Sequence, residues 1–340
     1  MPLLGAAGKT PARKKTIMSK AVEQTRSGLT VAHAGLGRAP DGTVDSVARA
    51  VHDGDTVSID PAGNVSTRLL GMDAPEVSFT LPDAPKTFRS IGSPQWADFL
   101  NDPFAAGTPP FDPPLAAPLL ADLRARLGAG CAANHAKHAG VATKVLEGLV
   151  DKDRTDKGAT LEDFRFFLAF ATDVIDRYGR FLCYLNVDVP KGQSHPLTYN
   201  ERLLAGGFVT PYFIWPNIDP FRRQPVLTDA VPVPGQPISD PRLDAARQSV
   251  KAARAAHDGV FETADPLRLL PFELRYLGRV AERGGQTVRT GPDRWVIDLN
   301  ATDGKLLAPH RYIEIPLPED RLFVPSEFLP LFLLKGWAEA

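Results

Sequence analysis

The stretch "VHDGDTVSID" (51–60) places two aspartates around one glycine, between segments in which valine alternates with polar residues. Such alternation is typical of strands with one buried face, and Asp-Gly favours a tight turn between them. A third segment of this kind, "NVSTRLLGM" (64–72), follows the turn "DPAGN" (60–64). The pattern predicts a β-meander of two or three strands, with the folded chain beginning near Thr43.

Charged residues stand among apolar strand residues in three short stretches, "DGDT" (53–56), "RLLGMDAPE" (68–76) and "DRYGR" (176–180). Because they lie at strand ends and turns, we expect them to meet at one mouth of a barrel. If Asp55 and Asp73 come together there, their charges repel unless a cation separates them or one is protonated. Hard carboxylate oxygens suit Ca²⁺ or Mg²⁺.

Two arginines and a further carboxylate complete this candidate site. Arg68 and Arg180 carry planar guanidinium groups, which bind phosphate oxygens in pairs and stabilise charge that develops on them. Glu76 can hold an attacking water molecule. Together these groups describe metal-assisted hydrolysis of a phosphodiester. The alternative is a type I′-compatible turn at 53–55, with the arginines in surface ion pairs.

The motifs "VHDGDTVSI…RLLGMDAPE…DRYGRFLCYL…NERLLAGGF" resemble the thermonuclease family, also called staphylococcal-nuclease-like domains, and follow the family's order from about residue 43 to 261. The resemblance implies an OB-fold: an α+β, mainly β domain with a five-stranded barrel and three helices. It further implies a calcium-dependent nuclease that cuts DNA or RNA, endonucleolytic and with 3′-phosphate products. The alternative function is a catalytically weak nuclease-like module that binds nucleic acid or protein.

The resemblance also assigns roles to the residues at the matching motif positions. It implies that the carboxylates of Asp55 and Asp73 and the backbone carbonyl of Ala74 are the calcium ligands. Glu76 would be the general base or would orient the attacking water. All the catalytic residue types of the family are present in this sequence.

Substrate contacts follow from the same resemblance. Arg68 and Arg180 would clamp the scissile phosphate, and Tyr178 matches the family tyrosine that hydrogen-bonds a substrate phosphate. "GGFVTPYFIWPN" (206–217) takes the place of the family's base-stacking aromatics. Phe213 and Trp215 are therefore candidates for a nucleobase platform, the alternative being aromatic side chains that close the core.

Local patterns predict further elements of the same domain. Apolar and small residues at helical spacing predict a helix over 131–150, and aromatic-rich segments predict strands over 161–174 and 180–189. Thr198 and Glu201 form a capping box that begins a short helix. Another helix begins at Asp240-Pro241, where aspartate is a good cap and proline a good first residue.

Three segments flank or interrupt this domain. Residues 1–42 are small and polar without periodicity, and are predicted to be a disordered lead-in. The proline-rich segment over about 82–128 is predicted to be a long surface insertion. Residues 262–340 form a C-terminal extension of mixed structure, with strands predicted in "RWVIDLN" (294–300), "RYIEIPL" (311–317) and "RLFVP" (321–325). This extension has no counterpart in the minimal family domain and is the candidate site for protein partners.

Composition bounds the function classes. The 340 residues are 43% apolar and carry a formal net charge of −1, so any contact with nucleic acid must rely on local positive patches. Only two cysteines are present, and no apolar run reaches the roughly 18 residues of a membrane span. With no secretory signal pattern at the N-terminus, we expect a cytoplasmic protein.

One further group of potential ligands stands on the helix predicted over 131–150. Cys131, His135 and His138 fall on one face of that helix and resemble part of a zinc site. Because the pattern offers no fourth ligand, a partly buried helix face is the favoured interpretation.

Overall fold

A five-stranded barrel of mixed strand directions is the centre of the first part of the chain. The computed structural model describes residues 22–24, 30–60, 65–176, 178–190, 192–220 and 226–340. The barrel strands follow the order β2 (Thr30–Leu36), β9 (Phe166–Ile175), β10 (Phe181–Val187), β5 (Val65–Leu69) and β4 (Thr56–Asp60). Antiparallel pairing of β4 with β2 closes the barrel, whereas β10 and β5 run parallel. The predicted five-stranded barrel with helices, an α+β fold, is therefore confirmed.

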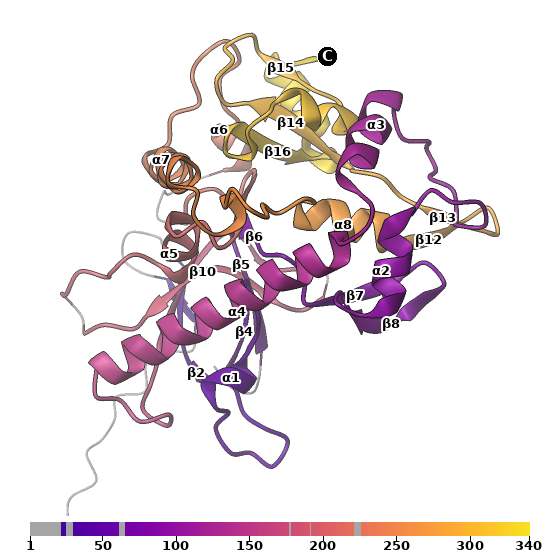
Figure 1. The fold of residues 1–340 in the computed structure, drawn as a ribbon. Coiled ribbons are helices and arrows are strands. Elements are labelled where there is room, and N and C mark those ends of the chain that lie inside the picture. The colour runs from indigo at the N-terminus through magenta and orange to yellow at the C-terminus, as the bar shows by residue number, and fades with distance from the viewer. Residues whose placement is uncertain (1–21, 25–29, 61–64, 177, 191, 221–225) are drawn as a thin grey trace, which may run out of the picture.

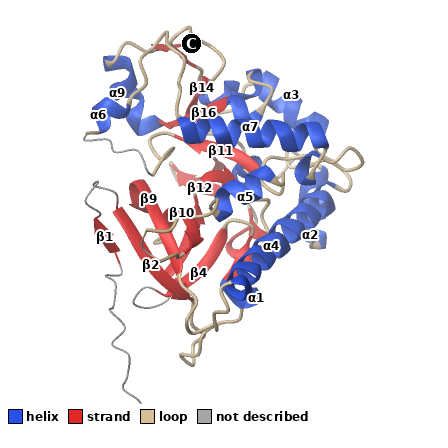
Figure 2. Ribbon diagram, turned by 90° about the vertical axis from the view of Figure 1, so that its left-hand side faces the viewer, coloured by secondary structure: helices blue, strands red, loops and turns tan. Residues whose placement is uncertain are grey.

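Helices cover one side of the barrel, as Figure 2 shows. The barrel core receives side chains from α1 (Val47–Ala50), α4 (Cys131–Asp156), α5 (Tyr199–Ala205) and α7 (Pro241–Ala256). The predicted capping box begins α5, and the Asp240 carboxylate caps α7. Described residues of 43–261 contain more α-helices than the three predicted. No helix in the described part of the chain is long and apolar enough to cross a membrane.

The prediction that residues 1–42 are disordered is wrong for residues 30–36, which form strand β2. β2 lies within 1–42, and its residues Ala32, Ala34 and Leu36 are buried in the barrel core. The sequence "TVAHAGL" hides this strand because small residues give no clear alternation of apolar and polar side chains. A short strand, β1 (Val22–Gln24), pairs with β2, while residues 1–21 lie outside the described residues.

The predicted surface insertion is also wrong. Residues 82–128 contain β8 (Ala84–Ser90), α2 (Pro94–Asn101) and α3 (Ala117–Arg126), and β8 pairs with β7 (Ser78–Leu81). Prolines stand in the first turns of α2 and α3, where a missing N–H costs no helical hydrogen bond. Trp96 and Leu100 from α2 and Leu119 and Leu123 from α3 are fully buried in a second hydrophobic core.

The C-terminal extension completes that second core and joins the sheet that carries Asp73. β16 (Arg321–Pro325) pairs with β14 (Arg294–Asp298) on one side and with β11 (Thr210–Ile214) on the other. β11 in turn pairs with β6 (Gly71–Asp73). α8 (Pro271–Gly278) crosses the middle of the molecule, between the barrel and these strands (Figure 1). The strands predicted over 294–300 and 321–325 are confirmed.

The third predicted strand of the extension is wrong, because 309–314 forms a 3₁₀ helix. A third core lies between α7, β11 and the chain end, where Phe332 and Trp337 are buried. The remaining elements are β3 (Val51–Asp53), α6 (Leu227–Ala230), β12 (Val280–Arg283), β13 (Gln286–Arg289), β15 (Lys305–Leu306), α9 (Leu329–Leu334) and β17 (Ala338–Glu339).

Candidate functional site

The turn between β3 and β4 aims Asp55 inward. The Asp55 backbone N–H donates to Asp53 Oδ1 at 3.2 Å, and the Asp55 side chain is buried. The backbone φ angle of Gly54 is not positive. A type I′ turn requires positive φ at both central residues, so the turn of the alternative interpretation does not form. The glycine is needed for space: a Cβ built there would lie 2.6 Å from the Ala142 Cβ of α4 and 3.0 Å from the Ala74 Cβ.

We expect Gly54→Ala to lower the free energy of unfolding by about 1–3 kcal/mol, because overpacking forces the turn away from α4. Urea unfolding of the purified variant measures this loss. Gly148→Ala is the matched control, since a Cβ at Gly148 meets nothing within 4 Å and alanine favours the surrounding helix. Equal unfolding midpoints for wild type and Gly54→Ala would contradict the close contact.

Arg68, at the end of β5, bridges the two aspartates predicted to be ligands. Its Nη1 lies 3.3 Å from Asp55 Oδ2, and its Nη2 donates to Asp73 Oδ1. Asp73 is held by its backbone as well, because β6 pairs with β11 and the Thr210 hydroxyl donates to the Asp73 carbonyl at 3.0 Å. The Ala74 N–H donates to Asp55 Oδ2 at 3.3 Å. The predicted convergence of Asp55, Arg68 and Asp73 is present.

Glu76 leaves the sheet beside these residues and is positioned from α4. Its backbone N–H donates to His135 Nε2 at 2.9 Å, so that nitrogen carries no proton. Burial lowers the pKa of His135 to about 3, with the charges of His138 and Arg275 acting in the same direction. His135 thus remains a neutral acceptor that fixes the Glu76 backbone, a role that the sequence interpretation of a helix-face histidine did not include.

Arg275, from the C-terminal α8, is the main site residue that sequence reasoning missed. Its Nη1 donates to Asp73 Oδ1 at 2.8 Å and to Glu76 Oε1 at 2.6 Å, and its Nη2 donates to Asp73 Oδ2 at 2.9 Å. A signal was present in "PFELRYLG" (271–278), where two charged residues, Glu273 and Arg275, stand in an apolar segment. Charged residues within an apolar segment were also the criterion that identified the three stretches 53–56, 68–76 and 176–180.

Burial and mutual charges set the protonation of this cluster. Burial, followed by the Asp55 charge, raises the pKa of Asp53 well above its usual range. Burial also acts to raise the pKa of Asp55, but Arg68 leads the contacts that bring it below its usual value. Burial raises the pKa of Glu76 despite the neighbouring guanidinium of Arg275. Burial and the contacts of this pair thus shift the pKa of Asp53 upward and the pKa of Asp55 downward.

The oxygen atoms of this cluster are of the type that binds calcium, but Arg275 is hydrogen-bonded to Asp73, one of the predicted ligands. Asp55, Asp73 and the Ala74 carbonyl offer hard oxygens of the kind that Ca²⁺ prefers. Both Asp73 oxygens, however, already accept N–H groups from arginine. Asp73 is 0% exposed, and the side chains of Arg68, Arg275 and Glu76 are only 15%, 14% and 12% exposed. A cation at Asp73 therefore requires Arg275 to release that carboxylate.

Arg180 and Tyr178 lie in the turn between β9 and β10, outside this cluster of contacts. Arg180 Nη2 is 2.8 Å from Asp176 Oδ2, and its guanidinium lies 5.6 Å from the centroid of the Tyr178 ring. The parallel register opposes Leu182 to Arg68, so Arg180 stands two residues before that pair. Tyr178 is 64% exposed and accessible to a ligand. Arg180 would have to leave Asp176 to hold a phosphate with Arg68.

The predicted nucleobase platform of Phe213 and Trp215 is wrong. Both side chains are buried in the third core, and Trp215 packs edge-on against Phe328 and Phe332. The indole N–H of Trp215 donates to the Ala230 carbonyl at 3.0 Å. Apolar residues of the C-terminal extension surround these rings in the third core, so the rings close the core, as the alternative interpretation held.

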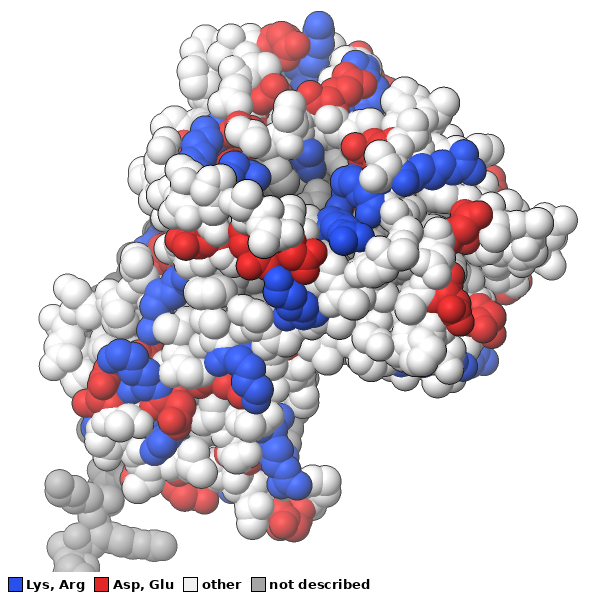
Figure 3. Space-filling view, in the orientation of Figure 1, with Lys and Arg blue, Asp and Glu red and all other residues white. Residues whose placement is uncertain are grey.

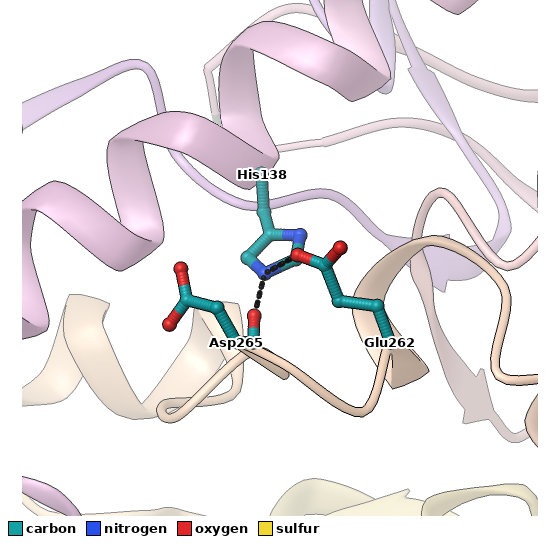
Figure 4. Close-up of side chains that lie close together, drawn as sticks. All are labelled: His138, Glu262 and Asp265. Atoms are coloured by element: carbon teal, nitrogen blue, oxygen red, sulfur yellow. Dashed lines mark hydrogen bonds and ion pairs between the residues drawn. The ribbon is translucent and has the colours of Figure 1, made fainter.

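A second cluster, shown in Figure 4, joins α4 to the start of the C-terminal extension. Its members His138, Glu262 and Asp265 form the one set in the described residues with three or more potential ligand atoms within 4.8 Å of one another. His138 Nε2 lies 2.9 Å from the Asp265 carbonyl, and Lys137 Nζ pairs with both carboxylates. Lys137 and Arg268, whose Nη2 lies 3.9 Å from Asp265 Oδ1, together balance the two carboxylates, so we interpret this cluster as a link between segments.

Charges of both signs alternate over the face shown in Figure 3, in line with the near-neutral net charge. No broad field of one sign covers this face, so a polyanion would have to be attracted locally. No family model matches this sequence, and no curated protein matches it. The case for a function therefore lies in the side chains that the fold brings together.

Proposed function

We propose that this protein is a thermonuclease-like hydrolase of the OB-fold class that cuts phosphodiester bonds of DNA or RNA with the help of Ca²⁺. The observation that carries the proposal is the convergence of Asp55, Asp73 and Glu76, which Arg68 and Arg275 join through ion pairs. Oxygen ligands, a guanidinium fork and a carboxylate for water are the groups that this reaction requires.

Each side chain has a defined part in this proposal. Asp55, Asp73 and the Ala74 carbonyl would hold the cation, which when bound neutralises phosphate charge and polarises the phosphorus centre. Arg68 would pair with two phosphate oxygens and stabilise charge that grows on them. Arg180 and the exposed Tyr178 would bind the same phosphate from the neighbouring turn.

Glu76 would hold the attacking water and take its proton. The water oxygen bonds to phosphorus and the P–O5′ bond breaks, which leaves a 3′-phosphate on one product. The departing O5′ takes a proton from solvent water and becomes a 5′-hydroxyl, and Glu76 returns its proton to solvent. A raised pKa brings the Glu76 carboxylate closer to the range in which it exchanges a proton readily.

A specific observation supports a second candidate, a nuclease-like module that binds nucleic acid or protein and cuts weakly. The cluster is closed: Asp73 is fully buried, and guanidinium groups occupy both of its oxygens. A phosphate or cation reaches it only after these contacts change.

Digestion assays separate the two candidates. We expect purified protein with Ca²⁺, titrated from micromolar to millimolar, to cut at least one of single-stranded DNA, duplex DNA and RNA, leaving 3′-phosphate ends. Chelator and Asp55→Asn should each stop cleavage, whereas the exposed control Asp303→Asn should not. Cleavage that persists in chelator contradicts the proposed mechanism. If all three substrates stay intact but shift on a native gel, the binding module is supported instead.

A further inference from the structure

The C-terminal extension places a charged side chain inside the candidate cation site. Arg275 forms a bidentate pair with Asp73, with Nη1 to Oδ1 at 2.8 Å and Nη2 to Oδ2 at 2.9 Å. The same Nη1 lies 2.6 Å from Glu76 Oε1. Arg275 thus joins a proposed calcium ligand to the proposed water-holding carboxylate, and both Asp73 oxygens are engaged.

The helix that carries Arg275 is firmly anchored. Glu273, two residues earlier in α8, is buried and accepts hydrogen bonds from Arg126 at 2.6 and 2.8 Å and from the Tyr312 hydroxyl at 2.6 Å. At the other end, a Cβ on Gly278 would lie 2.6 Å from the Thr80 carbonyl. Because α8 is fixed at both ends, the position of Arg275 is set by residues outside the barrel.

We propose that Arg275 is a built-in competitor of the divalent cation: its guanidinium holds Asp73 and Glu76 until a cation displaces it. The inference rests on the proposed function, since it deepens the account of the same site. In this way the extension, residues 262–340, would set the cation concentration at which the site becomes loaded.

The charges of the cluster support competition. Asp55, Asp73 and Glu76, counted as ionised, bring three negative charges, and Arg68 and Arg275 bring two positive charges. Removing the Arg275 side chain from the cluster changes its formal charge from −1 to −2, which one divalent cation neutralises. The Arg275 guanidinium and the cation therefore neutralise the same carboxylates. Binding of one disfavours binding of the other, because the two positive groups repel and would occupy the same space.

The hydrogen bonds disfavour a different role, in which Arg275 clamps the substrate phosphate. Both terminal nitrogens of its fork are directed at Asp73 and Glu76. A phosphate would have to replace these carboxylates, whereas a cation that binds Asp73 releases the fork as a direct consequence.

Isothermal titration with CaCl₂ tests the proposal. We expect Arg275→Gln to bind Ca²⁺ at least tenfold more tightly than the wild type, because glutamine is neutral and leaves Asp73 available. Arg275→Lys, which keeps the charge without the fork, should fall between the two. If Arg275→Gln folds only with Ca²⁺ present, the Ca²⁺ midpoint of its folding, followed by circular dichroism, gives the affinity.

Arg254→Gln is the matched control. Arg254 also forms a bidentate pair with a fully buried carboxylate, at distances of 3.0 and 2.6 Å, but its partner is Glu319 and not a carboxylate of the candidate site. The Ca²⁺ affinity of Arg254→Gln should equal that of the wild type. An equal gain in both variants, or unchanged or weaker Ca²⁺ binding by Arg275→Gln, overturns the proposal.

The titration and the digestion assay test the competition by Arg275 and the nuclease function independently of each other. If the wild type cuts nucleic acid with Ca²⁺ but Arg275→Gln shows no gain in affinity, the competition is wrong and the nuclease stands. If Arg275→Gln binds Ca²⁺ tenfold more tightly but neither protein cuts, the competition stands and the nuclease function is wrong.

Discussion

Deleting residues 262–340 is expected to abolish the folded state rather than release a minimal nuclease domain. The second core loses Leu274, Leu277 and Phe323, and the third core loses the covering of Trp215. Arg126 also loses its buried partner Glu273. Losses of this kind cost several kcal/mol each, which together exceed the stability of an ordinary domain, about 5–15 kcal/mol. Soluble yield and cooperative thermal unfolding of the 1–261 chain provide the measurement.

Two single substitutions in the full-length chain serve as controls, because a deletion removes many contacts at once. Leu277→Ala, at a fully buried position facing the second core, should lower the free energy of unfolding by about 2–5 kcal/mol. Leu334→Ala, at a position 82% exposed, should change it by less than about 0.5 kcal/mol. A 1–261 chain that unfolds cooperatively, with a barrel as stable as in the full chain, would show that the extension is an accessory.

Arg68→Lys is expected to lower the turnover of the proposed nuclease by about 10²–10³-fold. Lysine keeps one positive charge beside Asp55 and Asp73 but cannot reach both carboxylates, or two phosphate oxygens, with a planar fork. Lysine is preferable to alanine here, because alanine would leave two buried carboxylates without this partner and endanger the fold. Turnover at saturating Ca²⁺ is the measurement, with thermal unfolding as a check on folding.

Arg202→Lys is the corresponding control for the loss of a guanidinium fork. Arg202 pairs with both oxygens of Asp153, at 3.1 and 2.6 Å, on helices that pack against the barrel. Its replacement should leave turnover within about twofold of the wild type. If Arg68→Lys retains full turnover while folded, Arg68 does not stabilise the transition state, and the phosphate-binding role fails.

The sequence by itself determined the elements whose signals are local. The meander around 51–60, the long α4, and the capping box of α5 follow from periodicity and from caps a few residues apart. It also indicated that Asp55, Arg68, Asp73 and Glu76 would meet. They lie within 22 residues of one another, in turns and short strands that follow directly along the chain, so the local turns bring them to the same place.

Only the tertiary structure decided what surrounds that cluster. Arg275 reaches Asp73 across a separation of 202 residues, and Glu76 is fixed by His135, 59 residues away. The burial of Trp215 likewise depends on Phe328 and Phe332, more than 100 residues later in the chain. Such contacts arise from packing between complete elements, and a local pattern records which face of a helix or strand is apolar but not which segment will cover it.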